Sequence, residues 1–139
     1  MFQKILLAVD GSAHSDLAAD YAASLAAAFH TDLWVVHAYP QTSDMLGYSD
    51  FERLVARRKS AGQAVLDTVR KRLAQSGVTL HEDLLEGPEA EAILAAATSQ
   101  MADLVVMGTR GLGTIEGMLA GSVSRKVSQH AHCPVLLVR

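Results

Sequence analysis

Cysteine, proline and aromatic residues are scarce in this chain. Its 139 residues include one cysteine, Cys133, and three prolines, and aromatic side chains make up 5%. A single cysteine cannot form a disulfide within the chain, and a zinc site built from cysteines needs more than one. These absences exclude a disulfide-stapled secreted fold and suit a reducing compartment, so we expect a cytoplasmic location.

Long basic runs and long apolar runs are missing too. The longest basic run is the triplet at 57–59, and the formal net charge is -3. The chain therefore lacks the cluster of positive charge that binds the phosphate backbone of a nucleic acid. No apolar stretch approaches the ~18 residues of a membrane span. Its first residues are typical of a strand and not of a charged leader peptide. We expect no nucleic acid partner and no membrane partner.

The chain is rich in apolar residues, which can form one hydrophobic core. Apolar residues make up 50% of the sequence and charged residues 19%. This balance supports a buried core of ordinary size and argues against intrinsic disorder. The length fits one compact domain, so we expect residues 1–139 to form a single domain.

Short apolar runs alternate with segments of helical spacing. The runs predict strands at 4–9, 32–38, 78–85, 103–107 and 134–138. Apolar residues three and four apart predict helices from Ser12 to about Phe29, from 50 to about 76, after Pro88, and at about 119–131. Strict alternation implies parallel strands joined by right-handed crossovers. The expected fold is α/β and Rossmann-like: one open, doubly wound, five-stranded parallel sheet with four helices on both faces.

The loops after the first and fourth strands are the candidate site, because such sheets bind ligands beyond the carboxyl ends of their strands. Five glycines lie between Gly108 and Gly121, both included. Glycine lets main-chain amides turn toward an anion. Gly121 and Ser122 lie near a helix start, where free amides and the hydroxyls of Ser122 and Ser124 could bind phosphate. A flexible surface loop is the alternative.

Two common nucleotide-binding motifs are absent. The P-loop pattern GxxxxGK[ST] does not occur, and no lysine lies between Gly108 and Arg125. The first strand is followed by Asp10-Gly11-Ser12, which is not the GxGxxG of a dinucleotide fold. Any phosphate site in this chain must use another arrangement.

The glycine spacing resembles the ATP-binding pattern of a known family. Gly108, Gly111, Gly121 and Ser122 fill the pattern GxxG, nine residues, G[ST] of the small ATP-binding branch of the universal stress proteins. Three further stretches are similar to family patterns: KILLAVDGS at 4–12, VVHA at 35–38 and CPVLLV at 133–138. The resemblance spans essentially the whole chain.

The resemblance implies a sheet order of 3-2-1-4-5, with the first and fourth strands side by side, and a homodimer. It also implies ATP with magnesium as the ligand. Carried over position by position, the main chain at Ala8, Val9 and Ala38 would hold adenine. Asp10 would approach the ribose or a magnesium-linked phosphate. The residues implied to line the phosphates are Gly108, Gly111, Gly121, Ser122, Val123 and Ser124.

Three side chains in these loops have two interpretations each. Asp10 could bind the metal, or it could accept hydrogen bonds from the backbone of its own turn. Arg110 could bind ATP by neutralising phosphate charge, or it could be solvated. Glu116 would repel a triphosphate unless it points away or helps to hold the cation.

Other reactive residue types have structural explanations. We expect His37 to be a hydrogen-bonded core histidine and Cys133 to be a buried, inert thiol. Trp34 and Tyr39 flank the second strand and are expected to pack. The histidines show no pattern of metal ligands. No catalytic residue is therefore predicted.

Three functions stay open. The first is a regulatory protein that binds ATP and hydrolyses it slowly or not at all, because the loop has no lysine and no evident base. The second is a slow ATPase or autokinase that uses Ser122 or Ser124 as acceptor. The third is a nucleotide-free adaptor, for which Glu116 is the argument. The apolar segment 135–138 is expected at a sheet edge, where it could form a homodimer with a second copy.

Overall fold

Strands and helices alternate strictly along the part of the chain that the structure, a computed structural model, describes: residues 1–43, 47–110 and 121–139. The elements are β1 (Ile5–Ala8), α1 (Ala13–Ala28), β2 (Leu33–Tyr39), α2 (Tyr48–Arg72), β3 (Leu80–Glu86), α3 (Glu89–Ser99), β4 (Leu104–Gly108), α4 (Ser122–His130) and β5 (Val135–Val138). The predicted five strands and four helices are confirmed in these residues.

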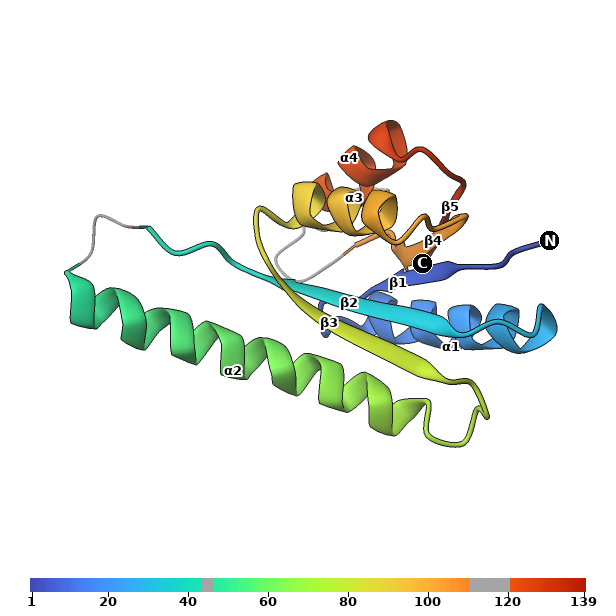
Figure 1. Ribbon diagram of the computed structural model, residues 1–139, viewed down its shortest axis with the longest axis horizontal. Coiled ribbons are helices and arrows are strands. Elements are labelled where there is room, and N and C mark those ends of the chain that lie inside the picture. Colours follow the sequence, from blue (N-terminus) through green and yellow to red (C-terminus); the bar gives the residue numbers. More distant parts are fainter. Residues whose placement is uncertain (44–46, 111–120) are drawn as a thin grey trace.

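One parallel sheet in the order β3-β2-β1-β4-β5 organises the molecule. β1 is central, and its Ile5 pairs with Leu33 of β2 on one side and with Leu104 of β4 on the other. Helices α1 and α2 cover one face, and α3 and α4 cover the other (Figure 1). The predicted sheet order and the helices on both faces are confirmed.

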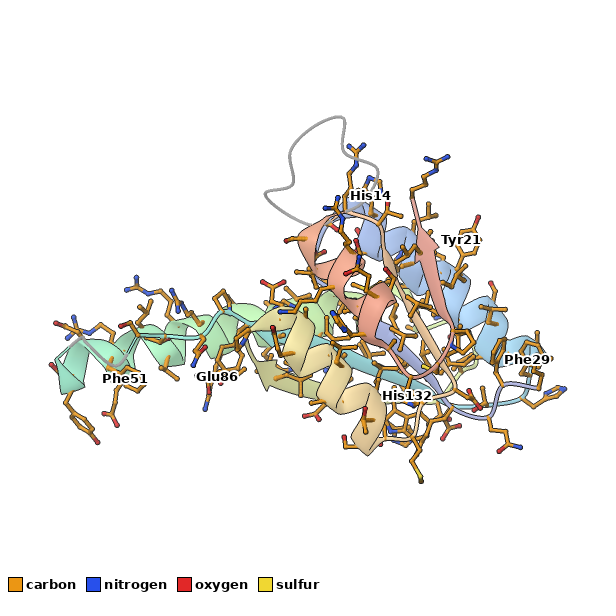
Figure 2. All side chains as sticks on the ribbon, turned by 90° about the horizontal axis from the view of Figure 1, so that it is seen from above. His14, Tyr21, Phe29, Phe51, Glu86 and His132 are labelled. Atoms are coloured by element: carbon orange, nitrogen blue, oxygen red, sulfur yellow. The ribbon has the colours of Figure 1, made fainter. Side chains whose placement is uncertain are left out.

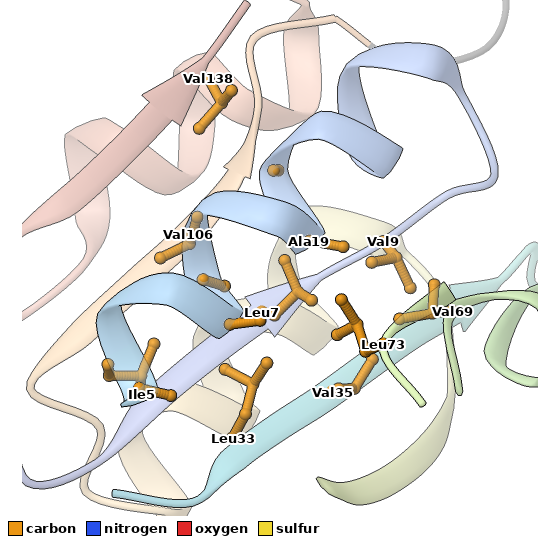
Figure 3. Close-up of a cluster of buried hydrophobic side chains, with 14 of the residues drawn as sticks. Ile5, Leu7, Val9, Ala19, Leu33, Val35, Val69, Leu73, Val106 and Val138 are labelled. Carbon is orange, nitrogen blue, oxygen red and sulfur yellow. The ribbon is translucent and has the colours of Figure 1, made fainter. Parts of the chain in front are cut away.

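Successive residues of β1 point to opposite faces and enter two separate cores. Ile5 and Leu7 join the apolar cluster beneath α1 and α2, which is drawn in Figure 3. Leu6 and Ala8 join the second cluster, beneath α3 and α4. All four side chains are buried, which explains why this strand appears in the sequence as a continuous apolar run.

The helix boundaries follow local chemistry. Ser12 caps α1 by accepting a hydrogen bond from the amide of Ser15. Predicted at 50–76, α2 begins two residues earlier and ends four residues earlier. Beyond its end, the amide of Ser76 donates to the carbonyl of Leu73, and Gly77 adopts φ +75. This turn stops the helix before the predicted boundary.

The outer strands and the last helix complete the frame. Both β3 and β5 lie at sheet edges, as predicted. Gly108 lies within β4 rather than in the loop after it, because it pairs with Val138 of β5. Helix α4 begins at Ser122, and residues 119 and 120 of its predicted range lie outside the described residues. Within the described ranges, no helix is long and apolar enough to cross a membrane.

Candidate functional site

The carboxyl ends of β1 and β4 lie side by side at the centre of the sheet. Ala8 pairs with Val36 of β2 and with Met107 of β4. The residues that follow these strands therefore meet at one edge, where α1 and α4 begin. Apart from Gly111, which lies outside the described residues, every sequence-predicted site residue belongs to this edge: Ala8, Val9, Asp10, Ala38, Gly108, Arg110, Gly121, Ser122, Val123 and Ser124.

Asp10 organises the turn between β1 and α1. Its Oδ1 accepts a hydrogen bond from the amide of Ser12 over 2.9 Å, and its own amide donates to Oγ of Ser15 over 3.0 Å. Gly11 completes the turn at φ +85, a conformation that favours glycine. The interpretation of Asp10 as an acceptor for its own turn is confirmed. A metal-binding role is a separate prediction, which this geometry does not test.

Thr109 joins the end of β4 to the start of α4. Its carbonyl oxygen accepts hydrogen bonds from the amide of Gly121 at 2.6 Å and from Oγ of Ser124 at 2.7 Å. Its amide donates to the carbonyl of Val138 at the end of β5. The sequence pattern passes over Thr109, because it fills a variable position between two patterned glycines. Its place directly after a buried strand is the one signal that could have pointed to it.

The start of α4 presents main-chain amides. Its first internal hydrogen bond runs from the amide of Arg125 to the carbonyl of Gly121, over 3.0 Å. The amides of residues 122–124 therefore have no acceptor within the helix, and they lie at the positive end of its dipole. Ser122 is exposed, whereas Val123 packs against the core. This arrangement can bind an anion through backbone groups alone.

The hydroxyl of Ser124 has a structural role. The side chain is buried, and Oγ lies within donating distance of two carbonyl oxygens, 2.7 Å from that of Thr109 and 3.1 Å from that of Gly121. In this geometry Ser124 can offer its amide to a ligand, while its hydroxyl closes the first turn of α4. Ser122 is the better placed of the two predicted acceptor serines.

Gly108 is a point of close contact between β4 and the first turn of α1. A Cβ at this position would lie 2.8 Å from Cβ of His14 and 2.9 Å from its carbonyl carbon, closer than real Cβ atoms come. Nδ1 of His14 lies 3.5 Å from Oγ1 of Thr109, and Oγ of Ser12 lies 3.4 Å from the carbonyl oxygen of Arg110. The absence of a side chain at Gly108 thus allows the first turn of α1 to contact the β4 end.

The main chain of Val9 is hydrogen-bonded at both of its polar groups. Its amide donates to the carbonyl of Val36 over 3.0 Å. Its carbonyl oxygen lies 2.7 Å from Nδ1 of His37, and since a carbonyl only accepts, this nitrogen carries the proton. The prediction of a hydrogen-bonded histidine is confirmed. An adenine contact at Val9 would have to use the second lone pair of the same oxygen.

Glu89 adds a second carboxyl group near Asp10, at the same edge of the sheet. It is the first residue of α3, and burial raises its pKa, with a further increase from the charge of Asp10; His37 acts in the opposite direction. The sequence shows Glu89 only as an acid in a helix first turn. Its proximity to Asp10 follows from the packing of α3 over the end of the sheet, and no sequence signal marked it.

The loop after β2 is held from two sides. Nη1 of Arg58 in α2 donates to the carbonyl of Gln41 over 2.7 Å and to Oγ1 of Thr42 over 3.0 Å. The amide of Gly87 donates to the carbonyl of Tyr39 over 2.7 Å. These bonds tie the residues after β2 to α2 and to the segment that leads into α3.

The remaining candidates have structural explanations. Cys133 is half-buried, and burial, followed by the charge of Asp103, raises the pKa of its thiol, as expected for an unreactive cysteine. Tyr39 is buried, and Trp34 packs against the second core and stacks on His81, so both are packing residues as predicted. Among the described residues, no three histidine, cysteine or acidic side chains form a group that could hold a metal.

Comparison with known proteins places the chain among its relatives. A model of the universal stress protein family matches residues 1–139. A universal stress protein of Thermus aquaticus is 47% identical over 140 residues and covers 100% of both chains. Two solved structures share the fold. One is a universal stress protein in complex with cAMP, 30% identical, with a TM-score of 0.76 over 99% of this chain and 97% of that one. The other, UspA from Lactobacillus plantarum, is 20% identical, with a TM-score of 0.87 over 99% and 97%.

The family match extends along the entire sequence, and the fold of the described residues agrees with solved members. The strand order, the glycine spacing and the close relative all lead to the same conclusion. The chain belongs to the universal stress protein family.

Proposed function

We propose that this protein binds an adenine nucleotide, ATP with magnesium, at the carboxyl end of β1 and β4 and acts as a regulatory stress-response protein. The observation that carries the proposal is the hydrogen bond from Gly121 to Thr109, which fixes the amide-bearing start of α4 at this edge. Amides of residues 122–124, held at the positive end of a helix dipole, would bind the phosphates.

Two further observations support an adenine nucleotide. The 30% identical universal stress protein was solved in complex with cAMP. The pattern formed by Gly108, Gly111, Gly121 and Ser122 has the spacing that led us to expect ATP. Adenine would lie against the ends of β1 and β2, at Ala8, Val9 and Ala38. Arg110, directly after β4, would add positive charge for the phosphates.

Asp10 is the residue proposed to approach magnesium. A magnesium ion keeps several waters and needs only one or two carboxylates when phosphate oxygens supply the rest. The half-buried Asp10, in a turn fixed by Ser12 and Ser15, fits that requirement. When bound, the ion would neutralise phosphate charge, and Asp10 would orient the phosphate chain toward α4.

Turnover is proposed to be slow or absent. Fast phosphoryl transfer needs an oriented nucleophile and positive charge that stabilises the transferring phosphoryl group. The loop contains no lysine between Gly108 and Arg125, and the hydroxyl of Ser124 lies against carbonyl oxygens. Nucleotide occupancy, rather than hydrolysis, would then change what the protein binds.

Calorimetric titration of the purified protein with Mg-ATP tests the proposal. We expect saturable binding with one site per chain and a rise in melting temperature, since a ligand at about a thousandfold its Kd adds roughly 4 kcal/mol to the stability of the folded state. AMP, cAMP and GTP are the comparison ligands. No heat and no melting shift with any adenine nucleotide at millimolar concentration would contradict the proposal and favour a nucleotide-free adaptor. Glu116, the argument for that alternative, lies outside the described residues.

A slow autokinase is the second candidate, and the exposure of Ser122 favours it. Ser122 is the first residue of α4 and is exposed, whereas Ser124 is buried. Incubation with γ-labelled ATP followed by peptide mass analysis discriminates the two functions. Phosphate on Ser122, lost in Ser122→Ala, would establish the enzyme. If the protein carries no phosphate after long incubation, the result favours the regulatory function.

We also propose a homodimer in the cytoplasm, formed through the edge strand β5. Three of its four residues, Val135, Leu136 and Leu137, are only partly buried, and an edge strand offers unpaired backbone groups to a second copy. Size-exclusion chromatography with light scattering should give twice the mass of 14.8 kDa. A stable monomer at micromolar concentration would refute the dimer.

A further inference from the structure

The end of β2 runs past the end of β1. The last residue of β2 that pairs with β1 is Val36, whereas β2 continues to Tyr39. The amide of Val9 donates to the carbonyl of Val36, so the main-chain groups of Val36 face β1. Main-chain groups alternate sides along a strand, and those of Ala38 therefore face the same way, beyond the last pair. An adenine contact at Ala38 thus depends on where the end of β2 is held.

One side chain of α2 contacts three successive residues after β2. We call these residues, 40–42, the β2 extension. Nη1 of Arg58 lies 2.7 Å from the carbonyl oxygen of Gln41 and 3.0 Å from Oγ1 of Thr42. The carbonyl oxygen of Pro40 is 3.3 Å from the same nitrogen. A guanidinium is always charged and only donates, so each of these bonds is charge-assisted.

A second contact holds the same stretch of main chain. The amide of Gly87 donates to the carbonyl oxygen of Tyr39 over 2.7 Å. A Cβ at Gly87 would lie 3.1 Å from that oxygen and 3.4 Å from the amide nitrogen of Gln41, so the two backbones are in close contact. The end of β2 is therefore held by Gly87, and the β2 extension by Arg58.

Arg58 is held in place by the packing of α2. A Cβ at Gly62, four residues after Arg58, would lie 3.1 Å from Cδ2 of His37 in β2, so the helix and the sheet are in close contact there. Residues four apart share one face of a helix, which places the half-buried Arg58 on the face toward the sheet. Figure 2 shows Phe51, near the start of α2, beyond Glu86, the last residue of β3. The start of α2 thus extends past the sheet, where Arg58 reaches the β2 extension.

We propose that Arg58 is a positioning residue for base selection, which holds the β2 extension, and through it the main chain of Ala38, in the place that adenine requires. The inference rests on the function proposed above and names what sets base selectivity at that site. Adenine carries an amino donor where guanine carries a carbonyl acceptor, so main-chain groups held in one place favour one base. If the β2 extension moves, this preference weakens, while the amides at the start of α4 keep their positions.

Amide hydrogen exchange without ligand tests the positioning step. Arg58→Met removes the charged donor and keeps an aliphatic stem of similar length. Arg57→Met is the matched control, because Arg57 is the neighbouring arginine of α2 and is exposed. We expect faster exchange in peptides covering 39–43 for Arg58→Met than for Arg57→Met or the unmodified chain. Equal exchange in all three proteins would show that Arg58 does not hold the β2 extension.

Calorimetric titrations with Mg-ATP and Mg-GTP test base selection. We expect the unmodified chain to prefer ATP. In Arg58→Met, ATP affinity should fall about tenfold, the factor for one hydrogen bond from a charged group, and GTP affinity should stay the same. Arg58→Lys keeps a charged donor on a shorter side chain, so it should restore part of the preference for ATP. Arg57→Met should behave as the unmodified chain.

Thr42→Val tests the same contact from its other partner. Thr42 is buried, and valine keeps its shape while removing the hydroxyl that accepts from Arg58. We expect Thr42→Val to lower the preference for ATP in the same direction as Arg58→Met. The double variant should lose no more than Arg58→Met alone, because both changes remove one interaction. Losses that add in full would mean that the two residues act separately, and the inference would then fail.

Three further outcomes would overturn the inference while nucleotide binding itself stands. ATP and GTP affinities could fall by the same factor in Arg58→Met, the preference for ATP could persist in that variant, or the unmodified chain could bind both nucleotides equally. Melting curves without ligand establish that each variant is folded. If the unmodified chain binds no nucleotide, the proposed function fails and base selection fails with it. The exchange experiment distinguishes the two failures, because it reports the Arg58 contact without any ligand.

Discussion

The amide of Gly121 donates a hydrogen bond to the carbonyl oxygen of Thr109, with 2.6 Å between the two atoms. The amide of Thr109 in turn donates to the carbonyl of Val138. These two bonds fix the start of α4 and the ends of β4 and β5 relative to one another. The amides at the start of α4 are thereby positioned by the sheet, which is the arrangement a phosphate site needs.

Replacing Ser122 by proline should weaken nucleotide binding without unfolding α4. Proline is tolerated at the first helical position, and Gly121 already has the extended conformation, φ -75 and ψ 167, that a following proline requires. The change removes one amide, so affinity should fall about tenfold, the loss of one charge-assisted hydrogen bond. Titration with Mg-ATP measures it.

Ser122→Ala is the matched control, because it removes the hydroxyl and keeps the amide. If both variants bind Mg-ATP as the unmodified chain does, the amide of residue 122 does not contact the ligand. Equal losses in the two variants would assign the contact to the hydroxyl instead.

Gly108→Ala should destabilise the protein. The new methyl group would meet Cβ and the carbonyl carbon of His14 at under 3.0 Å, and a backbone atom cannot rotate away. We expect a loss of about 1–3 kcal/mol, as for other overpacked sites. Urea denaturation measures the free energy of unfolding. Gly47→Ala is the control without a clash, since a Cβ there meets no other atom within 4 Å among the described residues, and it should lose only the preference for glycine over alanine at the N-cap of α2, less than Gly108→Ala.

Ser124→Ala should cost about 1 kcal/mol of stability. The variant removes the buried hydroxyl that closes the first turn of α4 onto the Thr109 carbonyl. Ser128 makes a comparable bond to the carbonyl of Arg125, but on the exposed side of the same helix. Thermal or urea unfolding of Ser124→Ala and Ser128→Ala compares the two. A loss in Ser128→Ala as large as that in Ser124→Ala would disprove a special role for the buried bond.

Two carboxyl groups should give pH effects of opposite sign. Burial raises the folded-state pKa of Glu89 above 4.5, so its contribution to stability is full below that value and is lost as pH rises through the raised pKa. Glu89→Gln should therefore be more stable than the unmodified chain near neutral pH and equal to it in acid. Urea unfolding across this range measures the difference, and no gain at neutral pH would contradict it.

Asp20 provides the opposite case. Its hydrogen bond with Arg72 lowers its pKa below 3.8, so its contribution is present above that value and is lost as pH falls through the lowered pKa. Asp20→Asn should be less stable near neutral pH, by roughly 0.5 kcal/mol for an exposed ion pair, and equal in strong acid. A loss that persisted in strong acid would point to a cause other than this charge.

The glycine pattern predicts where the site lies but not what each glycine does. Gly108 was assigned to the phosphates by its spacing, and the structure adds a packing reason for it, the contact with the first turn of α1. Ser124 was a candidate phosphate acceptor, and its hydroxyl instead lies against two carbonyls. In both cases the partner lies on another element or turn, which residue spacing does not report.

The sequence by itself determined the alternation of strands and helices and the single parallel sheet with helices on both faces. These follow from apolar periodicity, which records local burial along the chain. The proposed place of the site, at the carboxyl ends of the strands, follows from the glycine spacing and from where such sheets bind ligands. Only the tertiary structure decided that Thr109 holds α4, that His14 lies beside Gly108, and that Glu89 lies near Asp10. Each of these pairs joins residues from different elements, so its geometry depends on how the helices pack over the ends of the strands, and no local pattern encodes that.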